Sequence, residues 1–233
     1  MRAMILAAGE GTRLRPLTDR LPKPMLPVAG RPLLVHQIEL LRRHGVREIA
    51  VNLWHKPEVA IDALGDGSAL GVRIAWSIEE RLLGTAGGVK HMAPFFADGT
   101  FFVLYGDVLT DADLSALLAF HRQRGAALTM ALHRPAALRQ CGVAHIDGTG
   151  RVLEFVEKPV PGEEPSGWAN AGVYAVEPEV LDQIPADEPF DFAYELFPLL
   201  LARGVPLFGY ASDALVVDIG TPERYERAQQ AAA

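Results

Sequence analysis

A glycine-rich loop near the N-terminus is the first segment whose residue types could do chemistry. It spans Ala7–Pro16 and reads AAGEGTRLRP. Glycines such as Gly9 and Gly11 let backbone N–H groups approach an anion closely, and Arg13 adds charge-assisted donors suited to phosphate oxygens. Two common phosphate motifs do not fit, because a dinucleotide fingerprint needs glycine where Leu14 stands and a P-loop needs a lysine. The loop therefore predicts a phosphate site of another kind, or else a plain strand-to-loop turn with surface arginines.

A stiff, proline-rich segment carries the first lysine of the chain. Three of the six residues from Pro22 to Pro27 are proline, which favours an extended backbone. Such a segment would hold Lys23 at a fixed reach beyond the glycine-rich loop. The alternative is a solvated loop lysine, and the residue types alone leave both interpretations open.

Two aspartates follow apolar strands that lie far apart in the sequence. Asp107 comes after the run Phe101–Tyr105 and Gly106, and Asp218 ends the run that starts at Leu215. Ligands of open α/β sheets bind beyond the carboxyl ends of strands, and Mg²⁺ takes one or two protein carboxylates together with phosphate oxygens and water. The pair therefore predicts a magnesium site, although an aspartate beside glycine at a strand end is also a common turn former.

The elements that must position these residues alternate between strand and helix in the first half of the chain. Short apolar runs predict strands at Arg2–Ala7, Glu48–Leu53, Val72–Ser77 and Phe101–Tyr105. Apolar residues at helical spacing predict helices at Arg31–His44, Pro57–Leu64, Thr85–Met92 and Leu114–Arg124. This alternation predicts an α/β fold with a mixed, mostly parallel sheet flanked by helices.

The second half has a different texture. Strand-like runs follow one another at Ala127–Leu132, Gly142–Ile146, Val152–Val156 and Ala171–Val176, which predicts a small antiparallel region. A helix is expected over Asp191–Arg203, capped by Asp191 and stopped by Gly204. Two further strands are expected at Val205–Tyr210 and Leu215–Asp218, before a last helix that Thr221 and Pro222 open.

Composition narrows the class of protein. The chain has 233 residues, 49% of them hydrophobic and 22% charged, which are ordinary globular values. Its formal net charge is −7 and it contains only four lysines, so a general nucleic-acid binder is not expected. The single cysteine, Cys141, rules out an intrachain disulfide and favours a reducing compartment, the cytoplasm. No apolar run approaches the ~20 residues needed to span a bilayer, and the apolar start fits a buried strand better than a signal peptide.

The segments AAGEGTRLRPLT and LPKPMLPVAGRPLL together resemble the N-terminal signature of the sugar-1-phosphate nucleotidyltransferases. In that family the glycine backbone and the arginine matching Arg13 hold the triphosphate, and the lysine matching Lys23 sits at the reacting phosphates. The stretch LGTAGG from Leu83 resembles the base-contacting segment, and the helix start after it could also offer N–H groups to an anion. The resemblance assigns the nucleotide to Ala8, Gly9, Gly11, Thr12, Arg13, Thr85, Gly87, Gly88 and Gly106.

Other matching motifs follow in the family's order. Asp107 resembles the "GD" aspartate and Asp218 the "DIGTP" aspartate, which implies that they are the Mg²⁺ pair. The EKP segment resembles the motif whose acid and lysine contact the sugar phosphate, and the NAG segment resembles the one whose asparagine contacts the sugar. The sugar-phosphate residues implied are Gly142, Glu157, Lys158 and Asn170, and the catalytic residues implied are Arg13, Lys23 and Lys158.

Two departures from the family pattern stand beside these matches. Many members have asparagine where Tyr105 stands, and tyrosine where Cys141 stands. The matches run from Met1 to Tyr225, which implies one catalytic domain of nucleotide-diphospho-sugar transferase fold, of the glycosyltransferase-A type, over residues 1–233. Its nucleotide part is expected at about 1–125, its sugar part at about 126–210, and the metal strand and last helix at 211–233. The left-handed β-helix extension that many relatives carry is not expected.

The resemblance implies that a nucleoside triphosphate and a sugar 1-phosphate give a nucleotide-sugar and pyrophosphate, with Mg²⁺ as cofactor. Three segments look most like those of mannose-1-phosphate guanylyltransferases: LLGTAGG, GDVLTD and DIGTPERY. Uridylyl or thymidylyl transfer to N-acetylmuramic acid 1-phosphate or glucose 1-phosphate is the alternative, as is a catalytically silent subunit that binds nucleotide-sugar. No nucleic-acid or membrane partner is expected; the oligomeric state is left open, with a homodimer as one option.

Overall fold

The computed structural model describes residues 1–135, 138–160 and 162–232, and its contacts divide the chain into two compact units. Unit 1 comprises Met1–Leu82, Val103–Asp111 and Leu215–Ala233, and unit 2 comprises Leu83–Phe102 and Ala112–Ala214. The predicted single catalytic domain, with its three parts, stays a prediction. None of the helices in the described ranges is long and apolar enough to cross a membrane.

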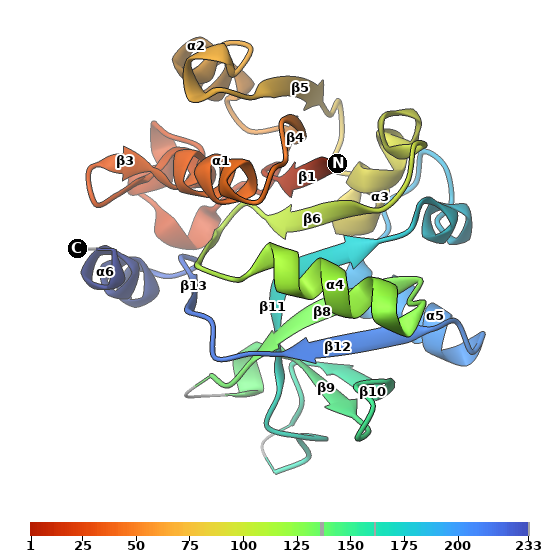
Figure 1. Cartoon of the computed structure of the whole chain (residues 1–233). Coiled ribbons are helices and arrows are strands. Elements are labelled where there is room, and N and C mark those ends of the chain that lie inside the picture. The colour runs from red at the N-terminus through yellow and green to blue at the C-terminus, as the bar shows by residue number, and fades with distance from the viewer. Residues whose placement is uncertain (136–137, 161, 233) are drawn as a thin grey trace. The chain divides into compact units, whose positions relative to one another are not determined.

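Unit 1 is built around a parallel sheet, as predicted. β1 (Arg2–Leu6) pairs with β4 (Glu48–Leu53), which pairs in turn with β5 (Arg73–Ile78), and β6 (Phe101–Tyr105) lies on the other side of β1. The central strands are almost wholly buried, which explains their continuous apolar sequence. The helices α1 (Leu33–Arg43) and α2 (Pro57–Leu64) connect successive parallel strands (Figure 1).

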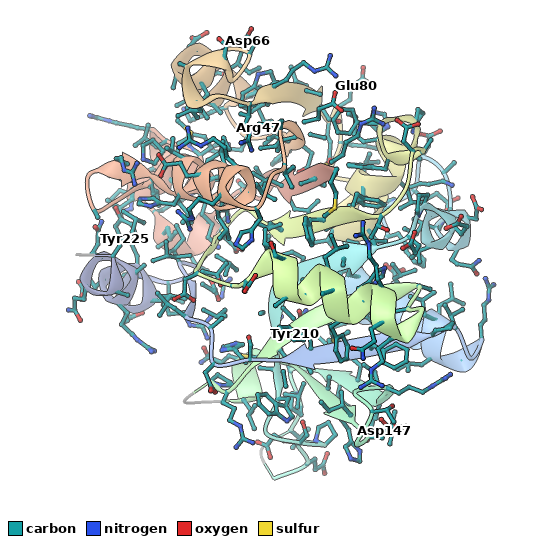
Figure 2. The ribbon with its side chains drawn as sticks, viewed as in Figure 1. Arg47, Asp66, Glu80, Asp147, Tyr210 and Tyr225 are labelled. Atoms are coloured by element: carbon teal, nitrogen blue, oxygen red, sulfur yellow. The ribbon has the colours of Figure 1, made fainter. Side chains whose placement is uncertain are left out.

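Two short strand pairs and a helix complete unit 1. β2 (Pro27–Val28) pairs with β3 (Arg31–Pro32), and β7 (Val108–Thr110) pairs with β13 (Val216–Asp218), which leads into α6 (Pro222–Ala231). The Tyr225 hydroxyl, labelled in Figure 2, donates to the Pro27 carbonyl at 2.6 Å and ties α6 to the hairpin. Buried side chains that pack together under these pieces are Leu14, Leu26, Val28, Leu33, Leu109, Val217, Ile219 and Ala228.

Unit 2 contains the predicted antiparallel region. β8 (Leu128–His133) pairs antiparallel with β11 (Ala169–Val176) and parallel with β12 (Leu207–Ala211), and β9 (Gly142–Ile146) pairs antiparallel with β10 (Val152–Glu157). The helix α4 (Leu114–Arg124) packs on β8 and β12 (Figure 1). The remaining α-helices of the unit are α3 (Gly84–His91) and α5 (Phe197–Ala202).

Two predicted helices differ from the observed ones. Arg31 and Pro32 lie in the β2–β3 hairpin, so α1 begins only at Leu33. The segment predicted as one helix from Asp191 is a π-helical turn, Phe192–Leu196, followed by α5. Asp191 caps this turn as predicted, because its carboxylate accepts from the Ala193 and Tyr194 amides. Short 3₁₀ turns, which the sequence did not predict, lie at Thr12–Leu14, Leu17–Asp19, Lys23–Met25, Ser68–Leu70, Ala93–Phe96, Leu138–Gln140 and Pro178–Gln183.

Candidate active site

The two aspartates lie together in unit 1 because of the β7–β13 pair. In this antiparallel ladder Asp218 is opposite Val108, the residue directly after Asp107. The next amide along, Ile219 N–H, donates to the Asp107 carbonyl at 2.9 Å. Two strand ends that are more than a hundred residues apart in the sequence are thus registered against each other. Asp107 lies shortly after β6 and Asp218 is the last residue of β13, and the short strand β7 brings them together.

Lys23 lies between the two carboxylates. Its Nζ donates to Asp107 Oδ2 at 2.5 Å and is 3.9 Å from Asp218 Oδ1. The Lys23 side chain is only 9% exposed, so the segment Pro22–Pro27 places a buried ammonium group on the acidic pair. The alternative of a solvated loop lysine is therefore wrong. The extended backbone predicted for this segment is wrong at Lys23–Met25, which forms a 3₁₀ turn. Because the aspartates are about a third exposed, the cluster is buried at its lysine end and open at its carboxylate end.

Two arginines complete the charged cluster. A methyl group placed on Gly220 would lie 3.1 Å from Arg13 Nη2 and 2.6 Å from Asp218 Oδ1, so the guanidinium of Arg13 lies against the Asp218 turn. Arg224, from the first turn of α6, donates to Asp218 Oδ2. Arg13 was predicted from the sequence as a site residue, but Arg224 was not. Arg224 contacts Asp218 because the first turn of α6, which Thr221 caps, directs its side chain toward that carboxylate. Three cations thus surround two carboxylates, leaving a positive local balance suited to phosphate.

The glycine-rich loop follows β1 directly. Gly11 has a φ of 68°, and a Cβ there would lie 2.9 Å from Thr18 Cγ2 and 3.2 Å from Lys23 Cβ, so only glycine fits. Leu14, where a dinucleotide fingerprint would need glycine, is 1% exposed and belongs to the core of unit 1. Among the predicted nucleotide residues of this loop, Ala8 is buried, Gly11 is partly exposed, and Gly9, Thr12 and Arg13 are exposed. Gly106, directly after β6, is also buried.

Gln37 is a residue of this site that sequence reasoning missed. It is 2% exposed on α1, and its Nε2 donates to the carbonyls of Tyr105 at 2.7 Å and Val108 at 2.8 Å. These two carbonyls flank the turn formed by Gly106 and Asp107, so one buried amide clamps the turn that carries the aspartate. A polar residue in the buried stripe of a predicted helix is the signal that could have found it.

We expect Gln37→Leu to lower kcat/KM roughly tenfold and the free energy of unfolding by about 1–3 kcal/mol, the cost of losing two buried hydrogen bonds. Steady-state kinetics and urea unfolding check both values. Gln229→Leu is the matched control, because the carbonyl that Gln229 releases, Pro27 O, keeps its hydrogen bond from Tyr225. Equal losses of activity in the two variants would contradict a specific role for Gln37.

The carboxylate pair fits a magnesium ion. Asp107 and Asp218 both reach one cationic atom, Lys23 Nζ, so their oxygens converge on a point where positive charge is held. Carboxylate oxygens are ligands that Mg²⁺ prefers, and it keeps water and substrate oxygens in its other positions. The described residues contain no group of three or more histidine, cysteine or acidic side chains placed to bind a metal. A two-carboxylate site completed by a phosphate ligand suits this chain better than a closed protein cage.

In unit 2, Gly142, Glu157 and Lys158 lie together on the β9–β10 pair. Gly142 is opposite Glu157, and a Cβ on it would lie 2.6 Å from Glu157 Oε2. Lys158 Nζ is 3.6 Å from Glu157 Oε1 and donates to the Tyr194 hydroxyl at 3.2 Å. Burial raises the pKa of the Glu157 carboxyl, against the opposing charge of Lys158, and nearby Asp191 raises this pKa further. The glycine thus leaves room for a partly buried acid beside an exposed lysine.

Asn170 and Thr85 are each held by a neighbouring side chain. Asn170 Nδ2 donates to the Tyr174 hydroxyl at 2.7 Å, and its Oδ1 accepts from the Gly172 amide at 3.0 Å. The Thr85 hydroxyl donates to Asp191 Oδ2 at 2.7 Å. Asp191 therefore binds Thr85, a predicted nucleotide residue, and is also close enough to Glu157 to raise the pKa of that carboxyl. Neither Asp191 nor Tyr174 was predicted from the sequence as a site residue.

The start of α3 packs against backbone. Gly87 and Gly88 are buried, and a Cβ on Gly87 would lie 2.8 Å from the Glu188 carbonyl. The Ala86 and Gly87 amides both donate to the Phe190 carbonyl at 2.9 Å. These two N–H groups, which the sequence suggested for an anion, are therefore used within unit 2, and Gly87 allows close packing there.

We expect Glu157→Gln to leave the thermal midpoint at pH 7 unchanged or raised. A carboxyl whose pKa is raised in the folded state stabilises that state below its usual pKa of 4.5, and the stabilisation is lost as pH rises through the raised value. The ionised carboxylate is thus the less favourable form at neutral pH, and its ion pair with the exposed Lys158 contributes little. Thermal unfolding measured from below the usual pKa of 4.5 up to neutral pH checks this expectation. A variant less stable than the wild type only at neutral pH would contradict it.

Comparison with known proteins identifies the relatives of the chain. The family described as nucleotidyl transferase matches residues 2–233. A UTP–glucose-1-phosphate uridylyltransferase from Synechocystis is 42% identical over 98% of this chain, and a mannose-1-phosphate guanylyltransferase from Mycobacterium tuberculosis is 41% identical over 97%. In both cases the chain spans only 62% of the relative's length.

Solved structures agree with the predicted fold. A putative glucose-1-phosphate thymidylyltransferase from Bacillus anthracis superposes with a TM-score of 0.90 over all of this chain and 95% of that one, at 24% identity. HddC from Yersinia pseudotuberculosis, complexed with GMP-PN, superposes with a TM-score of 0.84 over 99% of this chain and 98% of that one, at 27% identity. The α/β nucleotidyltransferase fold expected from the sequence is confirmed.

Proposed function

Because the chain belongs to the nucleotidyl transferase family, we propose that it converts a nucleoside triphosphate and a sugar 1-phosphate into a nucleotide-sugar and pyrophosphate. The observation that carries this proposal is the charged cluster of unit 1, in which buried Lys23 lies between Asp107 and Asp218 with Arg13 beside them. Such a cluster suits a triphosphate, because it offers both cations and metal-binding oxygens to it.

The reaction forms one P–O bond and breaks another. An oxygen of the sugar phosphate attacks the α-phosphorus, and the bond between that phosphorus and the bridging oxygen of pyrophosphate breaks in line. The nucleophile is already ionised, so no general base is needed, and the repulsion between two anions is the main barrier. Arg13 would neutralise the departing pyrophosphate and Lys23 the α-phosphate, while Lys158 would hold the sugar phosphate. Catalysis is then positioning and electrostatics.

Asp107 and Asp218 would hold Mg²⁺. When bound, this ion would supply charge neutralisation to the triphosphate oxygens. In the structure Lys23 Nζ lies between the two carboxylates, so positive charge is held at this point. With a triphosphate in the site, the same ammonium group would be available to a phosphate oxygen.

The substrate pair we favour is GTP and mannose 1-phosphate. Guanylyltransferases acting on mannose 1-phosphate are prominent among the relatives, but a uridylyltransferase acting on glucose 1-phosphate is equally similar. UTP or dTTP with glucose 1-phosphate or N-acetylmuramic acid 1-phosphate is therefore the alternative. All of the cations and both aspartates that the reaction needs are present, which favours an enzyme over a silent binding subunit.

The test is pyrophosphate release by the purified chain with Mg²⁺, measured for GTP, UTP, dTTP and CTP against mannose, glucose and N-acetylmuramic acid 1-phosphates. We expect release only when both substrates are present, with the highest kcat/KM for GTP and mannose 1-phosphate. A higher kcat/KM for another pair of substrates would change the assigned substrates but would still support the proposed reaction. Nucleotide-sugar binding without release for any pair would instead support the silent subunit.

A further inference from the structure

Tyr194 is an unusual surface residue of unit 2. It is the only aromatic side chain among the exposed large apolar residues in the described part of the chain, and it is 60% exposed. It lies in the π-helical turn Phe192–Leu196, whose other aromatic member, Phe192, is 1% exposed and packs against Tyr174. The turn therefore buries one ring in the core and presents the other to solvent. Single π-helical turns occur frequently at functional sites.

The exposed ring is attached to the proposed sugar-phosphate lysine. Lys158 Nζ donates to the Tyr194 hydroxyl at 3.2 Å and lies 5.6 Å from the centre of its ring. This hydrogen bond is the largest cause of a raised pKa at Lys158, and the adjacent Glu157 carboxylate adds to it. Because the hydroxyl oxygen accepts from the lysine, its own proton is left for another acceptor.

The backbone holds both partners of this contact. The Tyr194 amide donates to Asp191 Oδ1 at 3.1 Å, and the other oxygen of Asp191 accepts from Thr85. Lys158 has a φ of 52°, a left-handed conformation that is unfavourable before proline, and its amide donates to the Cys141 carbonyl at 3.1 Å. The ammonium and the ring are thus presented from fixed backbone positions, as a preorganised subsite requires.

We propose that Tyr194 is a positioning and specificity residue for the sugar 1-phosphate: its hydroxyl orients the Lys158 ammonium, and its ring face packs against the pyranose. A pyranose has apolar C–H faces and a polar rim, which matches an aromatic face beside a carboxylate and an ammonium group. Glu157 lies next to Lys158 and offers acceptor oxygens to that rim. The inference rests on the proposed function, since it specifies how the same subsite holds its sugar.

Two variants separate the ring from the hydroxyl. We expect Tyr194→Ala to raise KM for the sugar 1-phosphate roughly tenfold while KM for the nucleoside triphosphate changes little, because the ring and the hydroxyl that are removed both serve the sugar phosphate. Tyr194→Phe keeps the ring, so KM for the sugar 1-phosphate should stay near the wild-type value. Its kcat should fall about threefold, because Lys158 loses its orienting partner. Leu153→Ala is the matched control, since Leu153 is a 54% exposed apolar residue on β10.

A readout independent of turnover is the pKa of Lys158. With only four lysines in the chain, reductive ¹³C-methylation gives few NMR signals, and Lys158→Arg assigns the relevant one. The Lys158 pKa should fall in Tyr194→Phe and stay unchanged in Leu153→Ala. An unchanged pKa, or equal effects of Tyr194→Ala on both KM values, would overturn the proposal.

Failure of the proposed function is distinguishable from failure of this inference. If the wild type releases no pyrophosphate with any pair, calorimetric titration with mannose 1-phosphate and with glucose 1-phosphate replaces the kinetics. Weaker sugar-phosphate binding by Tyr194→Ala than by Tyr194→Phe would still support the subsite. Equal binding by both variants and the wild type would refute it.

Discussion

Lys23→Ala is expected to lower kcat/KM by at least ~100-fold, the scale of losing one preorganised charge contact to a reacting group. The wild-type ammonium is buried, held by the proline-rich segment, and 2.5 Å from Asp107 Oδ2. Its removal leaves two carboxylates with only Arg13 and Arg224 beside them, so the local charge falls from positive to neutral and no cation lies between the carboxylates. Steady-state kinetics with the preferred substrate pair measures the loss.

Lys56→Ala is the control for Lys23→Ala. Lys56 also precedes a proline in unit 1, but it caps α2 with a left-handed backbone instead of approaching the acidic pair. We expect its activity to stay near the wild-type value. Thermal unfolding of both variants separates a lost charge from a lost fold. Near-normal activity in a folded Lys23→Ala protein would contradict its placement at the reacting phosphates.

Asp107→Ala is expected to lower kcat/KM by at least ~100-fold as well, through a different group. Without this carboxylate the proposed Mg²⁺ site keeps only Asp218, and Lys23 loses its partner at the shorter distance. Removing one member of a partly buried ion pair leaves the other charge uncompensated, which is destabilising. The activity should therefore fall, and a higher Mg²⁺ concentration should be needed for half of the maximal rate. Rates measured over a series of Mg²⁺ concentrations check this.

The control here is Asp66→Ala, an exposed aspartate of unit 1 in the loop before β5 (Figure 2). Its carboxylate accepts from the Ser68 amide and has no role in the cluster around Lys23. Its activity and its Mg²⁺ dependence should match the wild type. A normal Mg²⁺ dependence in folded Asp107→Ala protein would show that this aspartate does not hold the ion.

Local sequence patterns predicted most elements of the fold. Glu48–Leu53, Pro57–Leu64 and Leu114–Arg124 have the expected bounds, because strong apolar periodicity and clear end signals coincide there. The caps Asp191 and Thr221 also act as expected, since capping depends only on neighbouring residues. The glycine loop and the two aspartates could be found because strand ends in an α/β sheet are where such residues do chemistry.

The rest depends on contacts between distant segments. β7 has three residues and no pattern of its own, yet it registers Asp107 against Asp218. Gln37 and Arg224 reach the cluster from helices whose other residues read as ordinary core and surface. The π-helical turn at Tyr194 likewise depends on Asp191 and Thr85, which are more than a hundred residues apart. Local sequence patterns do not contain information about such contacts between distant segments.

The most direct test of nucleotidyl transfer by this chain follows the α-phosphorus. The wild-type chain is incubated with Mg²⁺, mannose 1-phosphate and GTP labelled with ³²P at the α-position, and the products are separated by chromatography. We expect the label to appear in a nucleotide-sugar, with one unlabelled pyrophosphate released for each molecule formed. Label recovered only in GTP, or only in GMP or GDP, for this and every other nucleotide and sugar pair would contradict it.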